Sequence, residues 1–399
     1  MNRLNRHWAE LISRTDYERC ARPRAARFDL DGMRGLVERL GHPERAAPVL
    51  HVAGSKGKGS TCHFLEQGLR AAGRRTGLYT SPHLSDWRER IVVDGQLLDD
   101  AAYADAFEEV LAAAADGETF FDLMTAAAFC AFRAAGVEVA VIEVGLGGRA
   151  DSTNVVQPLA AVVTAIEREH VDVLGDSLAG IAGEKCGIYK RGAQAWCGAH
   201  LPAEARAVAE SAAAAVGERL RVPPPDGGDA WQHPIPAMRG NLALADAVLA
   251  GLPGGLASAA EALRTLPADR RMLPGRWETR HAADGRPVVF DLAHTEASLS
   301  AVLHAFRERW PNVPRGVVFA LRDDKDAAAL ARALGPAPPG ETWWTVPAGD
   351  HPRSADPTTI APLFGARPLA RPELPAGPEV LLVTGSTYLV GALRPATRP

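Results

Sequence analysis

One stretch of the chain has residue types and spacing suited to holding a nucleotide phosphate: His51–Thr61, with the sequence HVAGSKGKGST. Its glycines let backbone N–H groups point inward without a Cβ clash, and the start of a following helix would add further donors. Lys58 can reach the outer phosphates, and the hydroxyl of Ser60 or Thr61 can ligate Mg²⁺. The candidate phosphate-binding residues are Gly54, Ser55, Lys56, Gly57, Lys58, Gly59, Ser60 and Thr61.

The match to the usual P-loop pattern is imperfect. The first glycine is closer than that pattern asks, and Gly59 separates the lysine from its hydroxyl. The alternative interpretation is therefore a glycine-rich turn between a strand and a helix, with no ligand.

The loop needs a strand before it and a helix after it. The apolar run Pro48–Ala53 predicts a buried strand, and Cys62, Leu65 and Leu69 stand at helical spacing behind the loop. Further strands are expected at 77–80, 90–93, 137–144, 159–166 and 193–197. Helices are expected within 1–47 and at 101–115, 121–135, 178–188, 203–216, 241–252 and 257–266, with an irregular loop at 222–236. Strands that alternate with helices predict a doubly wound, mainly parallel sheet.

The pattern restarts after Thr265–Pro274, a stretch with prolines and charges that leads into a linker. Strands are expected at 288–292, 316–321, 342–346 and 380–384, and helices at 299–309 and 327–334. The expected fold class is α/β: a P-loop, doubly wound, mainly parallel sheet domain over residues 1–280, followed by a smaller Rossmann-like α/β C-terminal domain over 281–399.

The amino-acid composition limits the kinds of partner that the chain is expected to bind. The 399 residues are 47% hydrophobic and carry a net charge of −4, which gives no general attraction to nucleic acid or membrane. The five cysteines show no CxxC or metal-ligand spacing and indicate reduced thiols. The N-terminus is too polar for a signal peptide, and no stretch is apolar enough to span a bilayer. We expect a cytoplasmic monomer that binds neither nucleic acid nor membrane.

Two strand ends carry charge. Glu143 ends an apolar strand, where burial is costly unless a metal ion or a basic partner such as Arg149 relieves it. The next strand ends in Glu167-Arg168-Glu169-His170. Because ligands sit at the carboxyl ends of parallel strands, Glu143 and His170 could converge on an ATP-bound Mg²⁺. Mg²⁺ prefers oxygen ligands, so the alternative for His170 is a surface or hydrogen-bonded histidine.

Three other features each have a structural alternative. The glycines of Gly145–Gly148 could form a second phosphate loop, but the pattern favours a tight turn that brings the backbone close to a ligand. Glu184-Lys185 has the character of a solvated charge pair. Asp291 and His294 follow a strand and suit a nucleotide or a reacting group, whereas a helix capped at Thr295 would explain the same segment.

Several blocks, taken in order, resemble the folylpolyglutamate synthase/dihydrofolate synthase family of the ATP-dependent Mur ligase superfamily. These blocks are HVAGSKGKGST, YTSPHL with ERI, VIEVGLGGRADSTN, TAIEREHVDVLG with IAGEKCGIYK, PGRWE, DLAH, LRDDKD and VTGSTYLVG. The resemblance runs from the phosphate loop to the C-terminus. It implies an ATP-binding Mur ligase-like central domain and a C-terminal Mur ligase-like domain.

The resemblance implies a ligase that joins a carboxylate to an amine. ATP would phosphorylate the carboxylate of dihydropteroate to an acyl phosphate, and the amine of L-glutamate would displace phosphate to give an amide. Closure of the two domains would position the reactants and exclude water. Folates are candidate second substrates. The implied cofactors are ATP and Mg²⁺, with a monovalent cation such as K⁺ as a further candidate.

The resemblance also implies roles for individual residues. The implied catalytic residues are Lys58, Lys185 (carbamylated in the family), Asp291 and His294. The implied Mg²⁺ ligands are Ser60, Ser81, Glu143 and His170, and the further ATP contacts are Asn241, Arg276 and Asp291. The implied substrate-binding residues are Pro82, His83, Arg90, Phe121, Asp122, Ala150, Asp151 and Ser152.

The chain departs from the family pattern at a few positions. It has Thr295 where Asn is usual, Asp122 where Glu is usual, Cys186 where Ala is usual, and Trp87-Arg88 where Phe-Asn is usual. These changes leave open a ligase of the same chemistry acting on another acid or amino acid. A P-loop kinase and a nucleotide-binding switch without catalysis are the remaining alternatives. Glu143, His170, Lys185 and His294 argue against the last.

Overall fold

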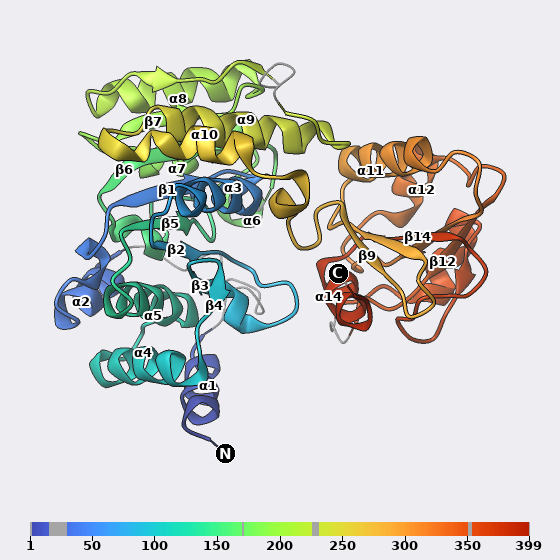
Figure 1. The fold of residues 1–399 in the computed structure, drawn as a ribbon, viewed down its shortest axis with the longest axis horizontal. Helices are drawn as coiled ribbons and strands as arrows, with labels where there is room; N and C mark the ends of the chain where they lie inside the picture. The colour runs from blue at the N-terminus through green and yellow to red at the C-terminus, as the bar shows by residue number, and fades with distance from the viewer. Residues whose placement is uncertain (1, 16–29, 170, 226–230, 350–352, 399) are drawn as a thin grey trace. The chain divides into compact units, whose positions relative to one another are not determined.

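The computed structural model describes residues 2–15, 30–169, 171–225, 231–349 and 353–398. The chain forms two compact units (Figure 1). The first comprises residues 1–83, 88–232 and 237–267, and the second comprises 84–87, 233–236 and 268–399. The main division therefore falls after Pro267, ahead of the boundary expected at residue 280.

A mainly parallel sheet forms the centre of the first unit. Over the described residues its strand order is β4-β3-β2-β5-β1-β6-β7-β8. The run from β2 to β8 is parallel, whereas β3 and β4 are antiparallel. The strands are β1 (Val49–Ala53), β2 (Thr76–Tyr79), β3 (Ile91–Val93), β4 (Gln96–Leu97), β5 (Val139–Glu143), β6 (Pro158–Val163), β7 (Gln194–Cys197) and β8 (Leu220–Arg221). The expected doubly wound sheet is confirmed.

Helices connect these strands (Figure 1). They are α1 (Arg3–Ser13), α2 (Asp31–Arg39), α3 (Lys58–Ala71), α4 (Asp100–Ala113), α5 (Phe120–Ala134), α6 (Val171–Leu174), α7 (Leu178–Lys185), α8 (Ala203–Ala215), α9 (Pro236–Ala250) and α10 (Ser258–Thr265). The helix expected from Asn241 begins earlier, at Pro236, a residue whose fixed φ suits a first helical turn. In the described part of the chain, no helix has the length and apolar character that crossing a membrane requires.

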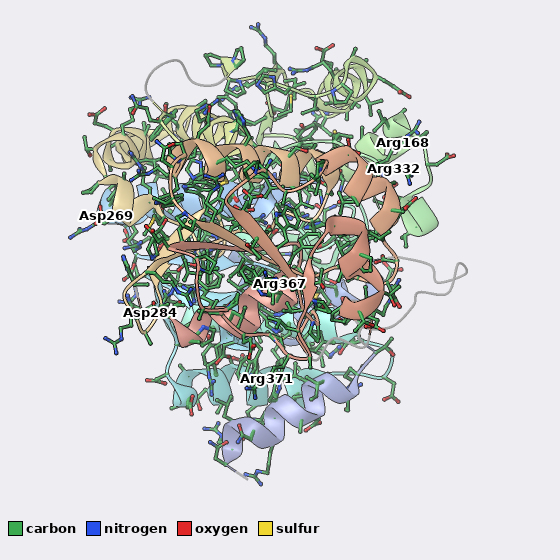
Figure 2. The ribbon with its side chains drawn as sticks, turned by 90° about the vertical axis from the view of Figure 1, so that its right-hand side faces the viewer. Arg168, Asp269, Asp284, Arg332, Arg367 and Arg371 are labelled. Atoms are coloured by element: carbon green, nitrogen blue, oxygen red, sulfur yellow. The ribbon has the colours of Figure 1, made fainter. Side chains whose placement is uncertain are left out.

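The second unit is built on its own sheet. Within the described residues its order is β13-β12-β11-β14-β10-β9, parallel except for β9. Its elements are β9 (Glu278–His281), β10 (Pro287–Phe290), α11 (Glu296–Arg309), β11 (Arg315–Phe319), α12 (Ala327–Leu334), β12 (Glu341–Thr345), α13 (Pro357–Ile360), β13 (Arg367–Pro368), β14 (Val380–Thr384) and α14 (Thr387–Leu393). Exposed charges of both signs lie on this unit, and Figure 2 labels Asp269, Asp284, Arg332, Arg367 and Arg371.

Strand β9 explains why the division comes before residue 280. Its sequence, Glu-Thr-Arg-His, has no apolar run, yet it pairs antiparallel with β10. Buried Glu278 accepts hydrogen bonds from Arg394 Nε at 2.8 Å and from the Gly275 N–H at 2.8 Å. Burial raises the pKa of Glu278, but Arg394, the Gly275 N–H and Arg280 together outweigh burial and leave the pKa below its usual value. Residues 275–281 thus belong to the second unit.

Helix α3, which follows the phosphate loop, packs closely against α10. A Cβ added to Gly68 would lie 2.8 Å from the Ala259 carbonyl oxygen and 2.6 Å from Leu249 Cδ1. Only glycine lets α3 approach its neighbours this closely. This contact fixes the helix whose first turn borders the phosphate loop.

We predict that Gly68→Ala lowers the free energy of unfolding by about 1–3 kcal/mol, because overpacking forces backbone apart. Gly183→Ala is the matched control: it is also helical, and an added Cβ meets no atom within 4 Å. The control should be neutral or more stable by up to about 1 kcal/mol. Thermal unfolding followed by circular dichroism checks both, and equal midpoints for the two variants would contradict the packing argument.

Candidate functional site

The phosphate loop depends on its glycines. Gly54 has φ +148°, and an added Cβ would lie 2.0 Å from Thr164 Oγ1. Gly57 has φ +84° and precedes α3, and its carbonyl accepts the Thr61 N–H at 2.9 Å. The loop therefore turns from β1 into α3 in a conformation that other residues adopt only with strain. It leaves backbone N–H groups at the positive end of a long helix.

The segment after β6 braces this loop. Thr164 Oγ1 donates to the Lys56 carbonyl at 2.6 Å. The Ser55 N–H donates to the Ala165 carbonyl at 2.7 Å, and Ser55 Oγ accepts the Glu167 N–H at 3.0 Å. The Ser55 hydroxyl thus fixes the loop to its neighbour.

Two lysines face one backbone oxygen of the loop. Lys58 Nζ and Lys185 Nζ each donate to the Gly54 carbonyl at 3.1 Å. Lys185 is only 2% exposed and pairs with Glu169 at 2.8 Å, so the solvated charge pair expected at Glu184-Lys185 is wrong for the lysine. Burial lowers the pKa of Lys185; Glu169 opposes this shift and Lys58 adds to it. Lys58 and the Lys185–Glu169 ion pair thus meet at one carbonyl of the phosphate loop.

Three of the four expected metal ligands lie on adjoining segments. Glu143, 5% exposed at the end of β5, accepts the Ser81 N–H at 3.1 Å. A Cβ added to Gly59 would lie 3.4 Å from Glu143 Oε2, so this carboxylate borders the first α3 turn, which contains Ser60. Two hydroxyls and a carboxylate are hard oxygen donors, which fit Mg²⁺. His170 lies outside the described residues.

The alternative partner for Glu143 is engaged elsewhere. Arg149 pairs with Glu184 at 3.4 Å and donates to the Gly183 carbonyl at 3.0 Å. Among the side chains that the structure describes, no group of three or more His, Cys, Asp or Glu could hold a metal ion by itself. A metal at Glu143 would therefore need hydroxyl and phosphate oxygens to complete its shell, as Mg²⁺ sites in nucleotide enzymes often do.

Asn241 of α9 lies against the phosphate loop. A Cβ added to Gly57 would lie 2.5 Å from its Oδ1. The helical period of this region places Asn241 on a helix but gives no sign of this contact.

The expected substrate residues of α5 and of the segment after β5 are linked. Asp122 Oδ2 accepts the Thr119 N–H at 2.8 Å, which caps α5, and Asp122 Oδ1 accepts the Ser152 hydroxyl at 2.6 Å. The Phe121 ring lies 6.0 Å from that of Tyr79. A Cβ on Gly145 would lie 2.5 Å from Phe121 Cζ, so the tight-turn interpretation of Gly145–Gly148 fits.

The segment after β2 contributes a buried cation. Arg90 is 2% exposed, and its Nε donates to His83 Nδ1 at 3.0 Å. Its guanidinium stacks 5.5 Å from the centre of the Phe120 ring. His83 therefore carries its proton on Nε2. Pro82 follows a cis peptide bond, and Ala150 is partly exposed.

In the second unit, the 275–277 turn lies beside the end of β10. Asp291, 5% exposed, accepts the Trp277 N–H and the Ala293 N–H, both at 2.9 Å. Burial raises the pKa of Asp291, and the charge of Arg276 opposes the shift. The unit thus brings Arg276 and Asp291, both expected to contact ATP, into one electrostatic environment.

His294 and Thr295 follow directly. His294 Nδ1 donates to the Leu292 carbonyl at 2.8 Å, so Nδ1 carries a proton. The Thr295 N–H donates to Ser298 Oγ at 3.0 Å, and α11 begins at Glu296. The helix-cap interpretation of Thr295 is confirmed, and it orients the residue just before it.

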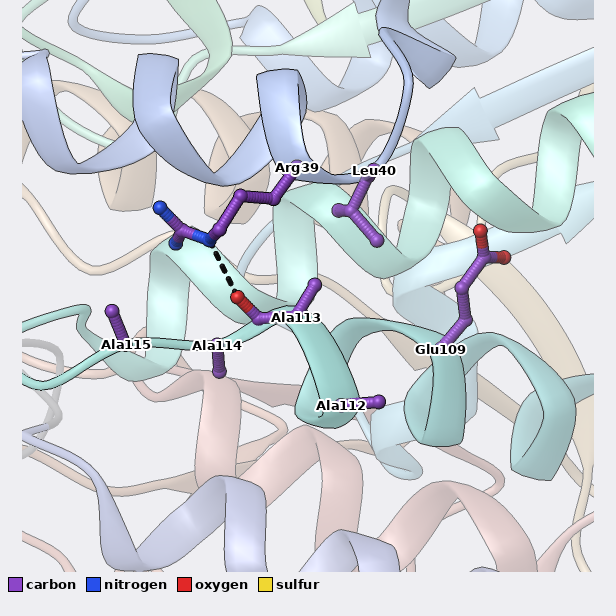
Figure 3. Close-up of a pocket in the computed structure, with 7 residues that line it drawn as sticks. All are labelled: Arg39, Leu40, Glu109, Ala112, Ala113, Ala114 and Ala115. Atoms are coloured by element: carbon purple, nitrogen blue, oxygen red, sulfur yellow. Dashed lines mark hydrogen bonds between the residues drawn. The ribbon is translucent and has the colours of Figure 1, made fainter.

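An open hollow lies elsewhere in the first unit. It measures about 590 Å³ and is lined by Arg39, Leu40, Glu109 and Ala112–Ala115, with Arg39 Nε donating to the Ala113 carbonyl at 2.7 Å (Figure 3). None of the candidate site residues lines it. The candidate site is therefore defined by the loops at the strand ends.

The chain matches two family models. Residues 52–198 match the Mur ligase middle domain, and residues 275–375 match the Mur ligase, glutamate ligase domain. The first range contains the phosphate loop, Glu143 and Lys185, and the second contains Arg276, Asp291 and His294.

A folylpolyglutamate synthase of Lacticaseibacillus casei is 30% identical over 396 residues, covering 90% of this chain and 92% of the relative. The chain belongs to the folylpolyglutamate synthase/dihydrofolate synthase family. A probable bifunctional folylpolyglutamate synthase/dihydropteroate synthase of Halobacterium salinarum is 35% identical over 80% of this chain. The chain spans only 42% of the length of that relative, and less of two further curated relatives.

A solved structure of the same family supports the fold over the whole chain. The bifunctional folylpolyglutamate synthase/dihydrofolate synthase of Yersinia pestis, complexed with AMPPNP and Mn ion, is 27% identical. It covers 98% of this chain and 97% of its own, with a TM-score of 0.79. A family member of this fold thus binds a nucleotide and a divalent metal.

Some participants were not assigned from the sequence. Thr164 closes on the phosphate loop and Glu169 pairs with Lys185. Both residues follow the apolar run of β6. Their position after a strand end is the sequence feature that could have marked them as site residues.

We predict that Lys58→Ala and Glu143→Ala each reduce ATP turnover by at least roughly 10²-fold, because each removes charge from the phosphate site. Both variants should keep the wild-type far-ultraviolet circular dichroism spectrum. Coupled ADP-release assays measure the loss, and an unchanged rate in either folded variant would contradict its assignment.

Proposed function

We propose that this protein is an ATP-dependent ligase that joins L-glutamate to dihydropteroate and also to folates. The observation that carries the proposal is the Lys58 ammonium at the Gly54 carbonyl, beside a helix start that borders the Glu143 carboxylate. This arrangement suits a polyphosphate and its metal ion. The relatives described above are named folylpolyglutamate synthase and folylpolyglutamate synthase/dihydrofolate synthase, names that fit this activity.

The chemistry makes demands that these residues meet. A carboxylate is a poor electrophile until one of its oxygens leaves as phosphate. Lys58 and the start of α3 would stabilise the charge that develops on the transferred phosphoryl group. The amine of L-glutamate would then form the C–N bond as the C–O bond to phosphate breaks, giving an amide, ADP and phosphate.

Ser60, Ser81, Glu143 and His170 would hold Mg²⁺, with a monovalent cation such as K⁺ as an auxiliary ion. Bound there, Mg²⁺ would act as a Lewis acid on phosphoryl oxygens. Asn241, Arg276 and Asp291 are proposed to contact the nucleotide, and His294 is proposed to lie near the transferred phosphate.

The acid substrate would be held by two groups of residues. Pro82, His83 and Arg90 form the first, and Phe121, Asp122, Ala150, Asp151 and Ser152 form the second. Asp122 uses one carboxylate oxygen on the α5 cap and the other on Ser152. We therefore propose that Asp122 acts by holding Ser152 in place.

Two departures from the family pattern take part in contacts within the protein, which are compatible with the same substrates. Arg88 pairs with Asp100 at 3.3 Å, and Thr295 caps α11. Asp122 retains a carboxylate, and Cys186 is buried. We propose that the enzyme works as a cytoplasmic monomer.

Steady ADP release should require dihydropteroate and L-glutamate together, because the acyl phosphate needs an amine to complete turnover. Purified protein is assayed with each substrate omitted in turn and with other amino acids substituted, and mass spectrometry identifies the product. ADP release that continues without any amino acid would favour a kinase or an ATPase. Turnover with a different acid alone would replace the proposed substrate.

We predict that Lys185 carries a carbamate. Its lowered pKa leaves more neutral amine at pH 7, and only the neutral amine adds to CO₂. Lys185→Ala should lose most activity and regain part of it with millimolar short carboxylic acids, which replace the lost anion. Lys58→Ala is the control that the same acids should not rescue. A folded Lys185→Ala variant that no carboxylic acid rescues would count against the carbamate.

A further inference from the structure

A histidine stands inside the strand that leads into the phosphate loop. β1 is buried at every position, and His51 is 0% exposed between apolar neighbours. His51 Nε2 lies 2.8 Å from Thr153 Oγ1. The Thr153 hydroxyl in turn bonds Asp151 Oδ1, which also accepts the Thr153 N–H at 3.0 Å. A buried side-chain connection therefore runs from β1 to the segment after β5.

The direction of the hydrogen bonds in this connection follows from the residue at its end, Asp151. An ionised Asp151 carboxylate only accepts, so the Thr153 hydroxyl donates to it and must accept from His51. His51 therefore carries a proton on Nε2. Burial, with a smaller contribution from the charge of Lys190, lowers the pKa of His51 to about 3. Its Nδ1 has no hydrogen-bond partner in the part of the chain that the structure describes.

Asp151 organises the loop that precedes it. Asp151 Oδ2 accepts the Leu146 N–H at 2.9 Å, which closes the turn 146–151 on the carboxylate. The next residue, Ser152, donates to Asp122 of α5 at 2.6 Å. Adjacent residues of one loop are thus held from two elements: Asp151 from β1 through Thr153, and Ser152 from α5.

We propose that His51 and Thr153 are positioning residues for the acid substrate: through Asp151 they hold the 145–152 loop in its binding conformation and tie it to the strand that carries the phosphate loop. This inference rests on the proposed function, in which Ala150, Asp151 and Ser152 contact the acid. A polar residue in a central apolar strand is costly unless its hydrogen bond has a use. Here the bond leads directly to the loop.

The proposal distinguishes the two substrates. Loss of the His51–Thr153–Asp151 connection loosens the 145–152 loop, which is proposed to contact the acid, but leaves Lys58, Gly54 and Glu143 in place. The KM for dihydropteroate should therefore rise while the KM for ATP stays unchanged. A purely structural role would lower stability without separating the two KM values.

Thr153→Val tests this most cleanly, because it keeps the side-chain shape and removes only the hydroxyl. We expect its KM for dihydropteroate to rise about tenfold or more, as for loss of a hydrogen bond to a charged group. Thr153→Ser keeps the hydroxyl and should stay within about twofold of wild type. His51→Gln retains a donor near the position of Nε2 and should be milder than His51→Leu.

Thr76→Val is the matched control. Thr76 is also 0% exposed, and its hydroxyl donates to a buried carboxylate, Glu66, at 2.7 Å, away from the candidate site. It should lose comparable stability and keep both KM values. Equal KM values for dihydropteroate in Thr153→Val and Thr76→Val would overturn the proposal.

Hydrogen exchange separates this inference from the proposed function. The amides of Leu146 and Thr153, both bonded to Asp151, should exchange faster in Thr153→Val than in wild type or Thr76→Val. Unchanged exchange at these amides would overturn the proposal whatever the substrate. Wild-type protein that neither binds nor converts dihydropteroate would instead refute the proposed function and the acid-binding role. In that case the exchange rates would still decide whether the His51–Thr153–Asp151 connection orders the 145–152 loop.

Discussion

The Gly54 carbonyl, faced by two lysine ammonium groups, is the contact on which the candidate site depends. Like charges repel, and a buried lysine loses its hydration. The ion pair with Glu169 compensates the burial of Lys185. Lys58 is the first residue of α3 and is less buried. The lysines can share this oxygen only because the glycine loop turns its backbone toward them. A carbamate on Lys185, as proposed above, would replace one of the two positive charges with a negative one and so remove the repulsion, which leaves Lys58 and the start of α3 to attract a polyphosphate.

The parallel sheet turns this loop into a site. β2, β5, β1 and β6 are consecutive parallel neighbours, so the segments that follow them emerge at one edge. Those segments supply Ser81, Glu143, the phosphate loop and Glu169. The charged and hydroxyl side chains come from distant parts of the sequence, yet each lies within a few residues of a strand end. The same edge carries the 145–152 loop, which links the phosphate-binding strand to the proposed acid site through buried side chains.

The sequence predicted the strand–loop–helix unit and the clustering of charge at strand ends, because both follow from local apolar runs and glycine spacing. It did not predict β9, whose charged residues are buried by a tertiary ion pair between Glu278 and Arg394. Nor did it predict that Lys185 is buried, because that depends on a carbonyl 131 residues away. The Asp122–Ser152 and His51–Thr153 hydrogen bonds could not be predicted either, since they join elements that meet only in the folded chain. Family resemblance indicated several of these positions, and the geometry supplied their partners.

The central claim is that Lys58, Glu143 and the hydroxyls beside them surround a metal-bound triphosphate. The most direct test is a crystal structure of this protein with a non-hydrolysable ATP analogue and Mg²⁺. The account predicts phosphates over the Gly54–Gly57 loop and a metal about 2.0–2.1 Å from oxygens of Glu143 and of Ser60 or Ser81. A nucleotide bound elsewhere, or a metal held without Glu143, would contradict it.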